Sequence, residues 1–219
     1  DDIKSILRKE KPDIVGLSVY TPWRFNSFKL VKIAKEVGAK TIVGGPHITA
    51  MPELILKNYP YVDIAVRGEG EETVLEIAQN KNLSQIKGIT YRQNGNVISN
   101  EQRPFIADLD TLAFPSRHLL LMEKYFTRLN KYEYSLRPPG TTIMVARGCI
   151  NNCTFCESPF IWGGRIRFRT PSSVCDEIEQ LQNQYGINDI FFFDDTFNFS
   201  PDWIKKFHDE LKKRKLKIS

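Results

Sequence analysis

The stretch "GTTIMVARGCINNCTFC", residues 140–156, is an apolar segment of strand length that runs directly into a loop with three cysteines. A helical pattern follows, with Thr170 as N-cap, Pro171 in the first turn and Gly186 as a stop. Residues 189–198, "DIFFFDDTFN", then form a buried strand that ends in two carboxylates, and residues 200–214 form another helix. This order predicts the first β/α units of a partial barrel, with its chemistry at the carboxyl end of the first strand.

The chain before this stretch repeats strand and helix three times. Residues 13–20, 40–47 and the start of 62–79 are apolar runs typical of buried strands, and a helical pattern follows each of them. Strands that alternate with helices predict a parallel sheet covered on both faces. The predicted fold class is therefore α/β, with a Rossmann-like parallel sheet followed by the barrel units.

Between these two regions the sequence predicts a hairpin and a connector. Asn94–Gly95 is the preferred pair for a two-residue type I′ turn, so residues 86–100 are expected to form the hairpin. Residues 101–140 are rich in proline and poor in periodicity, with a short helix expected near residues 118–126. We predict a first domain at residues 1–85, a hairpin and linker at 86–140, and the N-terminal part of a barrel at 141–219.

Both ends of the sequence lie inside predicted elements. The first residues follow a helical pattern without an initiator Met, and the final "LKIS" resembles the start of a strand. We therefore expect a piece of a longer protein, with a first domain that lacks its first strand and with poor activity on its own.

Composition limits the class of protein. The 219 residues are 41% hydrophobic and 26% charged, as in a water-soluble globular protein. No run approaches the roughly 18 apolar residues of a membrane span, and no signal peptide is visible, so we expect a cytoplasmic protein. The net charge of +5 falls largely on residues 212–217 at the end of a helix, without the interleaved aromatic residues of a nucleic-acid patch.

The cysteine loop has the spacing Cys-x3-Cys-x2-Cys, from Cys149, Cys153 and Cys156. A short loop with this spacing is able to deliver three thiolates to a [4Fe–4S] cluster and leave one iron open for another ligand. Zinc is the competing metal, with Cys175 or a histidine as fourth ligand. Cys175 lies in a predicted helix near its core face, and the three histidines of the chain, His47, His118 and His208, are remote in sequence.

Small residues mark the carboxyl ends of the three predicted strands in the first domain. Ligands of open α/β sheets bind at this edge, and glycine allows a bulky ligand to approach the backbone closely. The alternative is that these are ordinary turn residues. The candidate residues are Ser18, Gly44, Gly45, Gly68, Glu69 and Gly70.

Two groups of charged residues in the second region have open roles. Asp194 and Asp195 end the second predicted strand, where they either contact a ligand or cap nearby backbone groups. Arg165, Arg167 and Arg169 alternate along "RIRFRT", where they either face an anionic ligand or form the solvated side of a strand.

The motif "RGCINNCTFC" resembles the signature of radical S-adenosylmethionine (radical SAM) enzymes. The earlier "VGLS", "VGGPHIT" and "RGEGEETVLE" are similar to the cobalamin-binding-type domain that precedes the barrel in one branch of that superfamily. This branch includes anaerobic magnesium-protoporphyrin monomethyl ester oxidative cyclase and cobalamin-dependent radical SAM methyltransferases. "IADLDTLAFPSRHLL" and "FFFDDTF" fit the same branch, so that the resemblance covers nearly the whole chain.

The resemblance implies roles for particular residues. The three loop cysteines would bind the [4Fe–4S] cluster, S-adenosylmethionine would chelate its open iron, and Phe155 would lie near the adenine. Asp194 and Asp195 occupy the strand end that contacts the methionine amino group in the superfamily. Reductive cleavage would give a 5′-deoxyadenosyl radical, and the protein would position the cofactors that carry this chemistry. Reduced flavodoxin or ferredoxin would donate the electron, and Ser18, Gly44 and Gly45 match the cobalamin-side pattern.

The sequence departs from the family pattern at one motif, and two other functions compete with this interpretation. The Asp-x-His-x-x-Gly motif that supplies a histidine to cobalt in many cobalamin domains is absent, which leaves cobalamin binding open. The implied reaction is an anaerobic oxidative cyclisation or a methyl transfer on an unknown small molecule. Methylthiotransferases are a close rival, although their leading domain carries cysteines and residues 1–148 contain none. The rival of another class is a non-catalytic iron–sulfur or zinc module.

Overall fold

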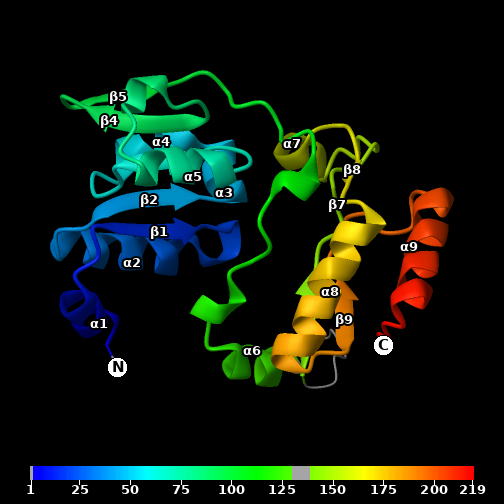
Figure 1. Cartoon of the computed structure of the whole chain (residues 1–219). Coiled ribbons are helices and arrows are strands. Elements are labelled where there is room, and N and C mark those ends of the chain that lie inside the picture. Colours follow the sequence, from blue (N-terminus) through cyan, green and yellow to red (C-terminus); the bar gives the residue numbers. More distant parts are fainter. Residues whose placement is uncertain (1, 130–138) are drawn as a thin grey trace. The chain divides into compact units, whose positions relative to one another are not determined.

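The computed structural model describes residues 2–129 and 139–219. Part of the predicted connector, residues 130–138, lies outside the described residues. The chain divides into two compact units, Asp1–Phe105 and Ile106–Ser219. Figure 1 shows the elements of each unit along the chain.

The first unit is built on a five-stranded sheet of order β1-β2-β3-β4-β5. The first three strands are parallel neighbours, which confirms the predicted parallel sheet. The last two strands are antiparallel, so that the sheet as a whole is mixed. The strands are β1 (Ile14–Ser18), β2 (Lys40–Gly44), β3 (Ile64–Val66), β4 (Ile89–Gln93) and β5 (Asn96–Ser99).

Helices connect the parallel strands, and both faces of the sheet are buried. Val43 of β2 packs in one apolar cluster, and the preceding Ile42 packs in a second cluster, because successive strand side chains point to opposite faces. The helices of this unit are α1 (Ile3–Glu10), α2 (Arg24–Glu36), α3 (Pro46–Ala50), α4 (Pro52–Asn58) and α5 (Glu71–Ala78), with short 3-10 turns η1 (Thr21–Trp23) and η2 (Leu83–Gln85).

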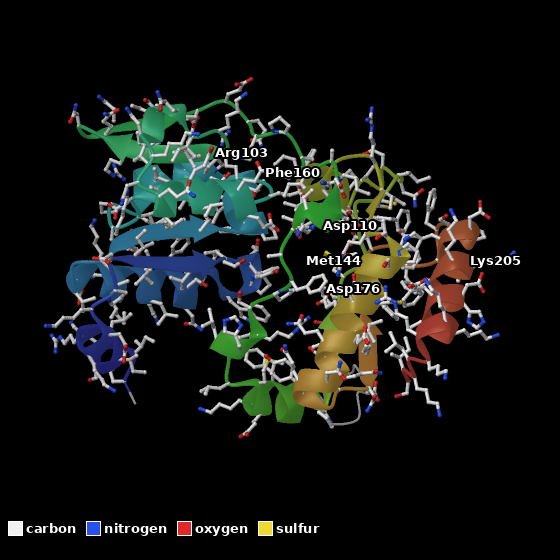
Figure 2. All side chains as sticks on the ribbon, viewed as in Figure 1. Arg103, Asp110, Met144, Phe160, Asp176 and Lys205 are labelled. Carbon is white, nitrogen blue, oxygen red and sulfur yellow. The ribbon has the colours of Figure 1, made fainter. Side chains whose placement is uncertain are left out.

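The hairpin belongs to the first unit. Its turn residues Asn94 and Gly95 both have positive φ, 50° and 79°, as a type I′ turn requires. The sequence pattern groups the hairpin with the linker, whereas in the structure β4 pairs with β3 and buries Ile89 and Tyr91 in the core. The chain beyond it is also anchored, because Arg103 (Figure 2) donates from Nε to the hydroxyl of Thr73 on α5 at 2.8 Å.

The second unit contains the two predicted strand–helix repeats. Strand β6 (Gly140–Ile143) pairs in parallel with β9 (Asp189–Phe192), and β7 (Ala146–Arg147) pairs antiparallel with β8 (Arg167–Phe168). Ser219 pairs with the start of β9. Its N–H donates to the carbonyl of Asn188 at 3.0 Å, and its carbonyl accepts from the N–H of Ile190 at 3.1 Å. The final residues therefore begin to pair with β9 in parallel, as a strand start predicts.

Local signals set the helices of this unit. Thr170 and Ser200 cap α8 (Pro171–Tyr185) and α9 (Pro201–Arg214) with their hydroxyls, and Gly186 ends α8 in the left-handed conformation. The Thr170 cap and the Gly186 stop confirm the sequence prediction, and Ser200 caps the helix expected at residues 200–214. Asp110 (Figure 2) accepts the N–H of Thr170 at 3.0 Å and so holds the connector against the start of α8. The remaining elements are η3 (Leu109–Thr111), η4 (Arg117–Leu119), α6 (Met122–Leu129) and α7 (Ser158–Trp162).

A buried ion cluster forms around Glu177 on the buried face of α8. Glu177 is 2% exposed, and its carboxylate pairs with Arg169 and, at 2.7 Å, with Arg117. Arg167 instead donates to the carbonyls of Ile106 and Trp162. Arg167 and Arg169 therefore take neither of the two roles predicted from the sequence, a contact with an anionic ligand or a solvated strand face. Each of them donates instead to acceptors inside the second unit.

We predict that Glu177→Ala lowers the free energy of unfolding by about 3–5 kcal/mol, because the change leaves the buried Arg117 and the largely buried Arg169 without their carboxylate partner. Glu179→Ala is the matched control on the same helix, since the Glu179 side chain is 52% exposed and lies 3.6 Å from Arg214. The control is expected to cost at most about 1 kcal/mol. Urea unfolding measures both, and equal losses in the two variants would contradict this account of the cluster.

Candidate functional site

The cysteine loop is held at its two ends by strand pairing. It leaves β7 at Arg147 and returns at β8, where Arg147 pairs with Arg167. Gly148 opens the loop with φ +101°, and a Cβ at this position would lie 2.0 Å from the carbonyl oxygen of Arg165. Only glycine fits such an approach. The sequence pattern alone does not mark this residue as restricted, although it directly precedes the first cysteine.

The structure presents the three predicted cysteines on this loop as free thiols. Cys153 and Cys156 are exposed and Cys149 is half-buried. Two donors approach their sulfurs: the N–H of Ser158 lies 3.5 Å from Cys156 Sγ, and the hydroxyl of Thr196 lies 3.8 Å from Cys149 Sγ. Within residues 2–129 and 139–219, no three Cys, His, Asp or Glu side chains converge as a metal site. The loop therefore brings the cysteines to one short segment without gathering their sulfurs.

The donor chemistry of this loop fits an iron–sulfur cluster with three protein ligands. The two exposed thiols are accessible, and the nearby N–H and O–H groups suit thiolate sulfur as an acceptor. Cys175 does not belong to this set, because it is fully buried in α8 and its burial raises the pKa of the thiol to about 11. A thiol with this pKa is a poor metal ligand at neutral pH.

Asp194 connects the end of β9 to the segment that leads into the loop. Its Oδ1 accepts the N–H groups of Val145 and Ala146 at 2.9 and 2.6 Å. Its Oδ2 is buried and has no hydrogen-bond partner in the described part of the chain. Burial raises the pKa of Asp194 from 3.8 to about 6, although the two N–H groups oppose this shift. One carboxylate oxygen thus caps backbone, and the other is left for a further donor.

The neighbouring residues of this strand end also face the loop. Asp195 accepts a hydrogen bond from the hydroxyl of Ser158, a buried residue two positions beyond Cys156. Thr196 approaches Cys149. Phe155 is 91% exposed between the second and third cysteines, so its ring is available to a ligand. The sequence gives no signal for Ser158 and Thr196, because single hydroxyl residues form no pattern.

The predicted strand-end residues of the first unit lie together at the carboxyl edge of its sheet. Ser18 pairs with Gly44 in the β1–β2 register. Gly45 has φ +92°, and a Cβ there would lie 2.7 Å from the Ser18 hydroxyl oxygen. Thr49 bridges to the third strand, because its hydroxyl donates to the Gly45 carbonyl and accepts the Gly68 N–H, both at 3.0 Å. Gly45 is therefore required for the chain to pack closely against β1, in addition to its place at the candidate ligand-binding edge.

Other residues at this edge were not predicted. His47 is buried next to the Gly44–Gly45 pair, with Nδ1 3.1 Å from the hydroxyl oxygen of Thr21, and burial lowers its pKa. Tyr20 and Trp23 are exposed directly after β1. Of the predicted residues at this edge, Glu69 is buried and Gly70 precedes α5. The sequence signal for His47 was its position directly after the strand-end glycines.

Two protein families match this chain in separate regions. Residues 1–78 match the B12 binding domain, and residues 143–219 match the radical SAM superfamily.

None of the helices formed by the described residues is long and apolar enough to cross a membrane.

The chain is similar to curated enzymes over most or all of its length. An uncharacterised methyltransferase of Pyrococcus horikoshii is 37% identical over 91% of this chain and 43% of the relative. Anaerobic magnesium-protoporphyrin IX monomethyl ester cyclase of Rubrivivax gelatinosus is 33% identical over 100% of this chain and 40% of the relative. The chain thus spans less than half the length of these curated relatives.

The fold resembles a solved structure of radical S-adenosylmethionine methyltransferase TsrM from Kitasatospora setae, which has tryptophan and an S-adenosylmethionine analogue bound. The TM-score is 0.74 over 98% of this chain and 43% of that chain, at 20% identity. At this identity the likeness concerns the fold alone.

We predict that Gly148→Ala strongly reduces the iron that the chain retains after anaerobic reconstitution. The left-handed backbone alone costs about 1–3 kcal/mol for alanine, and the clash with Arg165 displaces the loop further. Gly164→Ala is the control, because a Cβ there meets nothing within 4 Å. Iron and protein assays compare the variants, and equal iron in Gly148→Ala and wild type would show that the loop tolerates the clash.

We also predict that Asp194 makes stability depend on pH. Because its folded pKa lies near 6 and its unfolded pKa near 3.8, the folded chain retains a proton that the unfolded chain releases between these values. The contribution of Asp194 to the free energy of unfolding therefore falls as pH rises through this window. Asp194→Asn keeps the Oδ1 acceptor and abolishes the titration.

Urea unfolding of wild type and Asp194→Asn across the window measures this effect in the metal-free chain. The stability of wild type relative to the variant is expected to decrease from pH 3.8 to about 6 and then to level off. A relative stability that increases with pH would instead show that the carboxylate has a lowered pKa.

Proposed function

This chain belongs to the radical SAM superfamily, in the branch whose members carry an N-terminal B12-binding domain, and we propose that it takes part in reductive cleavage of S-adenosylmethionine coupled to methyl transfer. The observation that carries this proposal is the cysteine loop joined to the end of β9, with one Asp194 oxygen buried and unpaired among the described residues. Oxidative cyclisation is the second candidate, because a magnesium-protoporphyrin cyclase is 33% identical over the whole chain.

Cys149, Cys153 and Cys156 are the residues that would hold a [4Fe–4S] cluster. The cluster, when bound, supplies the electron that cleaves the carbon–sulfur bond of S-adenosylmethionine. The chain presents the cysteines on a loop whose first residue is restricted to glycine and whose ends are paired strands. These constraints hold the two ends of the loop before a cofactor binds, which reduces the entropy that binding must overcome.

Asp194 would bind the amino group of the methionine moiety. Its unpaired Oδ2 is an acceptor in a buried environment, where an ammonium donor would satisfy it. With a pKa of about 6, the carboxylate is mostly ionised at neutral pH and therefore attracts a cation. Asp195 acts differently, since it accepts from Ser158 and so positions the end of the cysteine loop.

Phe155 would contact the adenine. Its exposed ring lies between two of the cysteines, close in sequence to the ligands of the cluster. Stacking of an exposed phenylalanine on a purine buries apolar area of both partners. This role explains why a large apolar side chain is exposed at this position.

The carboxyl edge of the first unit would bind cobalamin. Ser18, Gly44, Gly45 and Gly68 lie together there, and Glu69 and Gly70 continue the third strand end. Strand ends of this kind leave backbone groups accessible to a large planar ligand. A reduced flavodoxin or ferredoxin would supply electrons to the second unit, and the acceptor of the methyl group would be a small molecule.

Anaerobic reconstitution followed by product analysis tests the proposal. Wild type with a reductant is expected to convert S-adenosylmethionine to 5′-deoxyadenosine and methionine, with S-adenosylhomocysteine as a second product if methyl transfer occurs. Alanine at any one of Cys149, Cys153 or Cys156 should reduce 5′-deoxyadenosine by more than about 100-fold, because loss of a direct ligand exceeds the effect of losing an outer contact.

Cys175→Ala is the control, since this buried thiol belongs to α8 and not to the loop. It should retain both the iron and the cleavage. Loss of iron in Cys175→Ala with retention in Cys149→Ala would refute the three-cysteine site. Cleavage without S-adenosylhomocysteine would favour the cyclisation candidate over methyl transfer.

A further inference from the structure

We infer that Thr196 is a positioning residue that donates a hydrogen bond to the Cys149 thiolate and thereby raises the reduction potential of the cluster. The inference rests on the proposed function, because it concerns the cluster that the three cysteines would hold. Its basis is the 3.8 Å contact between the Thr196 hydroxyl and Cys149 Sγ, which joins residues 47 positions apart in sequence.

The backbone fixes this contact on the side of β9. Phe193 donates its N–H to the carbonyl of Ile143 at 2.8 Å, which continues the β6–β9 pairing. One residue later, Asp194 accepts the N–H groups of Val145 and Ala146. Thr196 thus follows two consecutive anchors to the segment that ends at Cys149, and its distance from that cysteine is set by hydrogen bonds of the scaffold.

A second contact holds the far end of the loop. Asp195 accepts from the Ser158 hydroxyl, and the Ser158 N–H points at Cys156 Sγ from 3.5 Å. The three consecutive residues Asp194, Asp195 and Thr196, which follow β9, therefore each contact the cysteine loop or the segment that leads into it. Of these three contacts, only that of Thr196 reaches a sulfur directly.

The side chain of Thr196 suits a fixed donor. It is half-buried, and its β-branched Cβ restricts χ1, so little entropy is lost when the hydroxyl is oriented. The hydroxyl is neutral across the physiological range and adds no charge to the site. A hydrogen bond to a cluster sulfur favours the more negative, reduced cluster, and such bonds are one of the determinants of iron–sulfur potentials.

The experiment compares the reduction midpoint of reconstituted wild type, Thr196→Val and Thr196→Ser. Valine keeps the shape and removes the hydroxyl, whereas serine retains it. At a fixed potential we expect the ratio of reduced to oxidised cluster to fall about tenfold in Thr196→Val, or about 59 mV for a one-electron couple. Thr196→Ser should lie close to wild type. Thr142→Val on β6 makes the same chemical change away from the cysteines and should leave the midpoint unchanged.

Iron content and absorbance separate this inference from the proposed function. If wild type itself assembles no cluster, the proposed function fails. If wild type and Thr196→Val hold equal iron and have equal midpoints, the inference alone fails.

If Thr196→Val loses iron, the hydrogen bond is tested by the Fe–S(Cys) stretching bands of wild type and Thr196→Ser, recorded in light and in heavy water. A shift on exchange supports a hydroxyl bond to the thiolate, and unshifted bands overturn it.

Discussion

The hydrogen bonds from Val145 and Ala146 to the Asp194 carboxylate are the interaction on which the second unit depends. They explain why the apolar run at residues 140–147 divides into β6 and β7, since the N–H of Val145 at the break and that of Ala146 at the start of β7 bond to a side chain. They also bring the end of β9 to the start of the cysteine loop. The contact of the Thr196 hydroxyl with Cys149 Sγ follows from that placement.

Each unit uses one restricted glycine to bring a functional segment against a strand. Gly148 lets the cysteine loop pass the Arg165 carbonyl, and Gly45 lets the chain after β2 pass Ser18 at the end of β1. A side chain at either position would displace the segment that carries the candidate ligands. The chain thus combines close backbone approach with positive φ at both of its candidate cofactor sites, a combination that glycine tolerates.

Local signals predicted most elements, and long-range contacts account for what was missed. The caps Thr170 and Ser200 and the Asn94–Gly95 turn act within a few residues, so the sequence contains their full signal. The pairing of β4 with β3 depends on core residues far apart in the chain, and no local pattern specifies it. The role of Arg169 was missed because its partner Glu177 is a polar residue on the buried face of a helix. The cysteines were recognisable by spacing, whereas Thr196 has a role only through the fold.

We propose that three cysteines of one loop hold a cluster with one iron open to S-adenosylmethionine. Mössbauer spectroscopy of iron-57-reconstituted protein tests this claim most directly, because each iron reports its own ligands. We expect one iron of the cluster to change its isomer shift when S-adenosylmethionine is added, while the others remain the same. A spectrum that is unchanged by S-adenosylmethionine would contradict the account, because it would mean that no iron is open to this ligand.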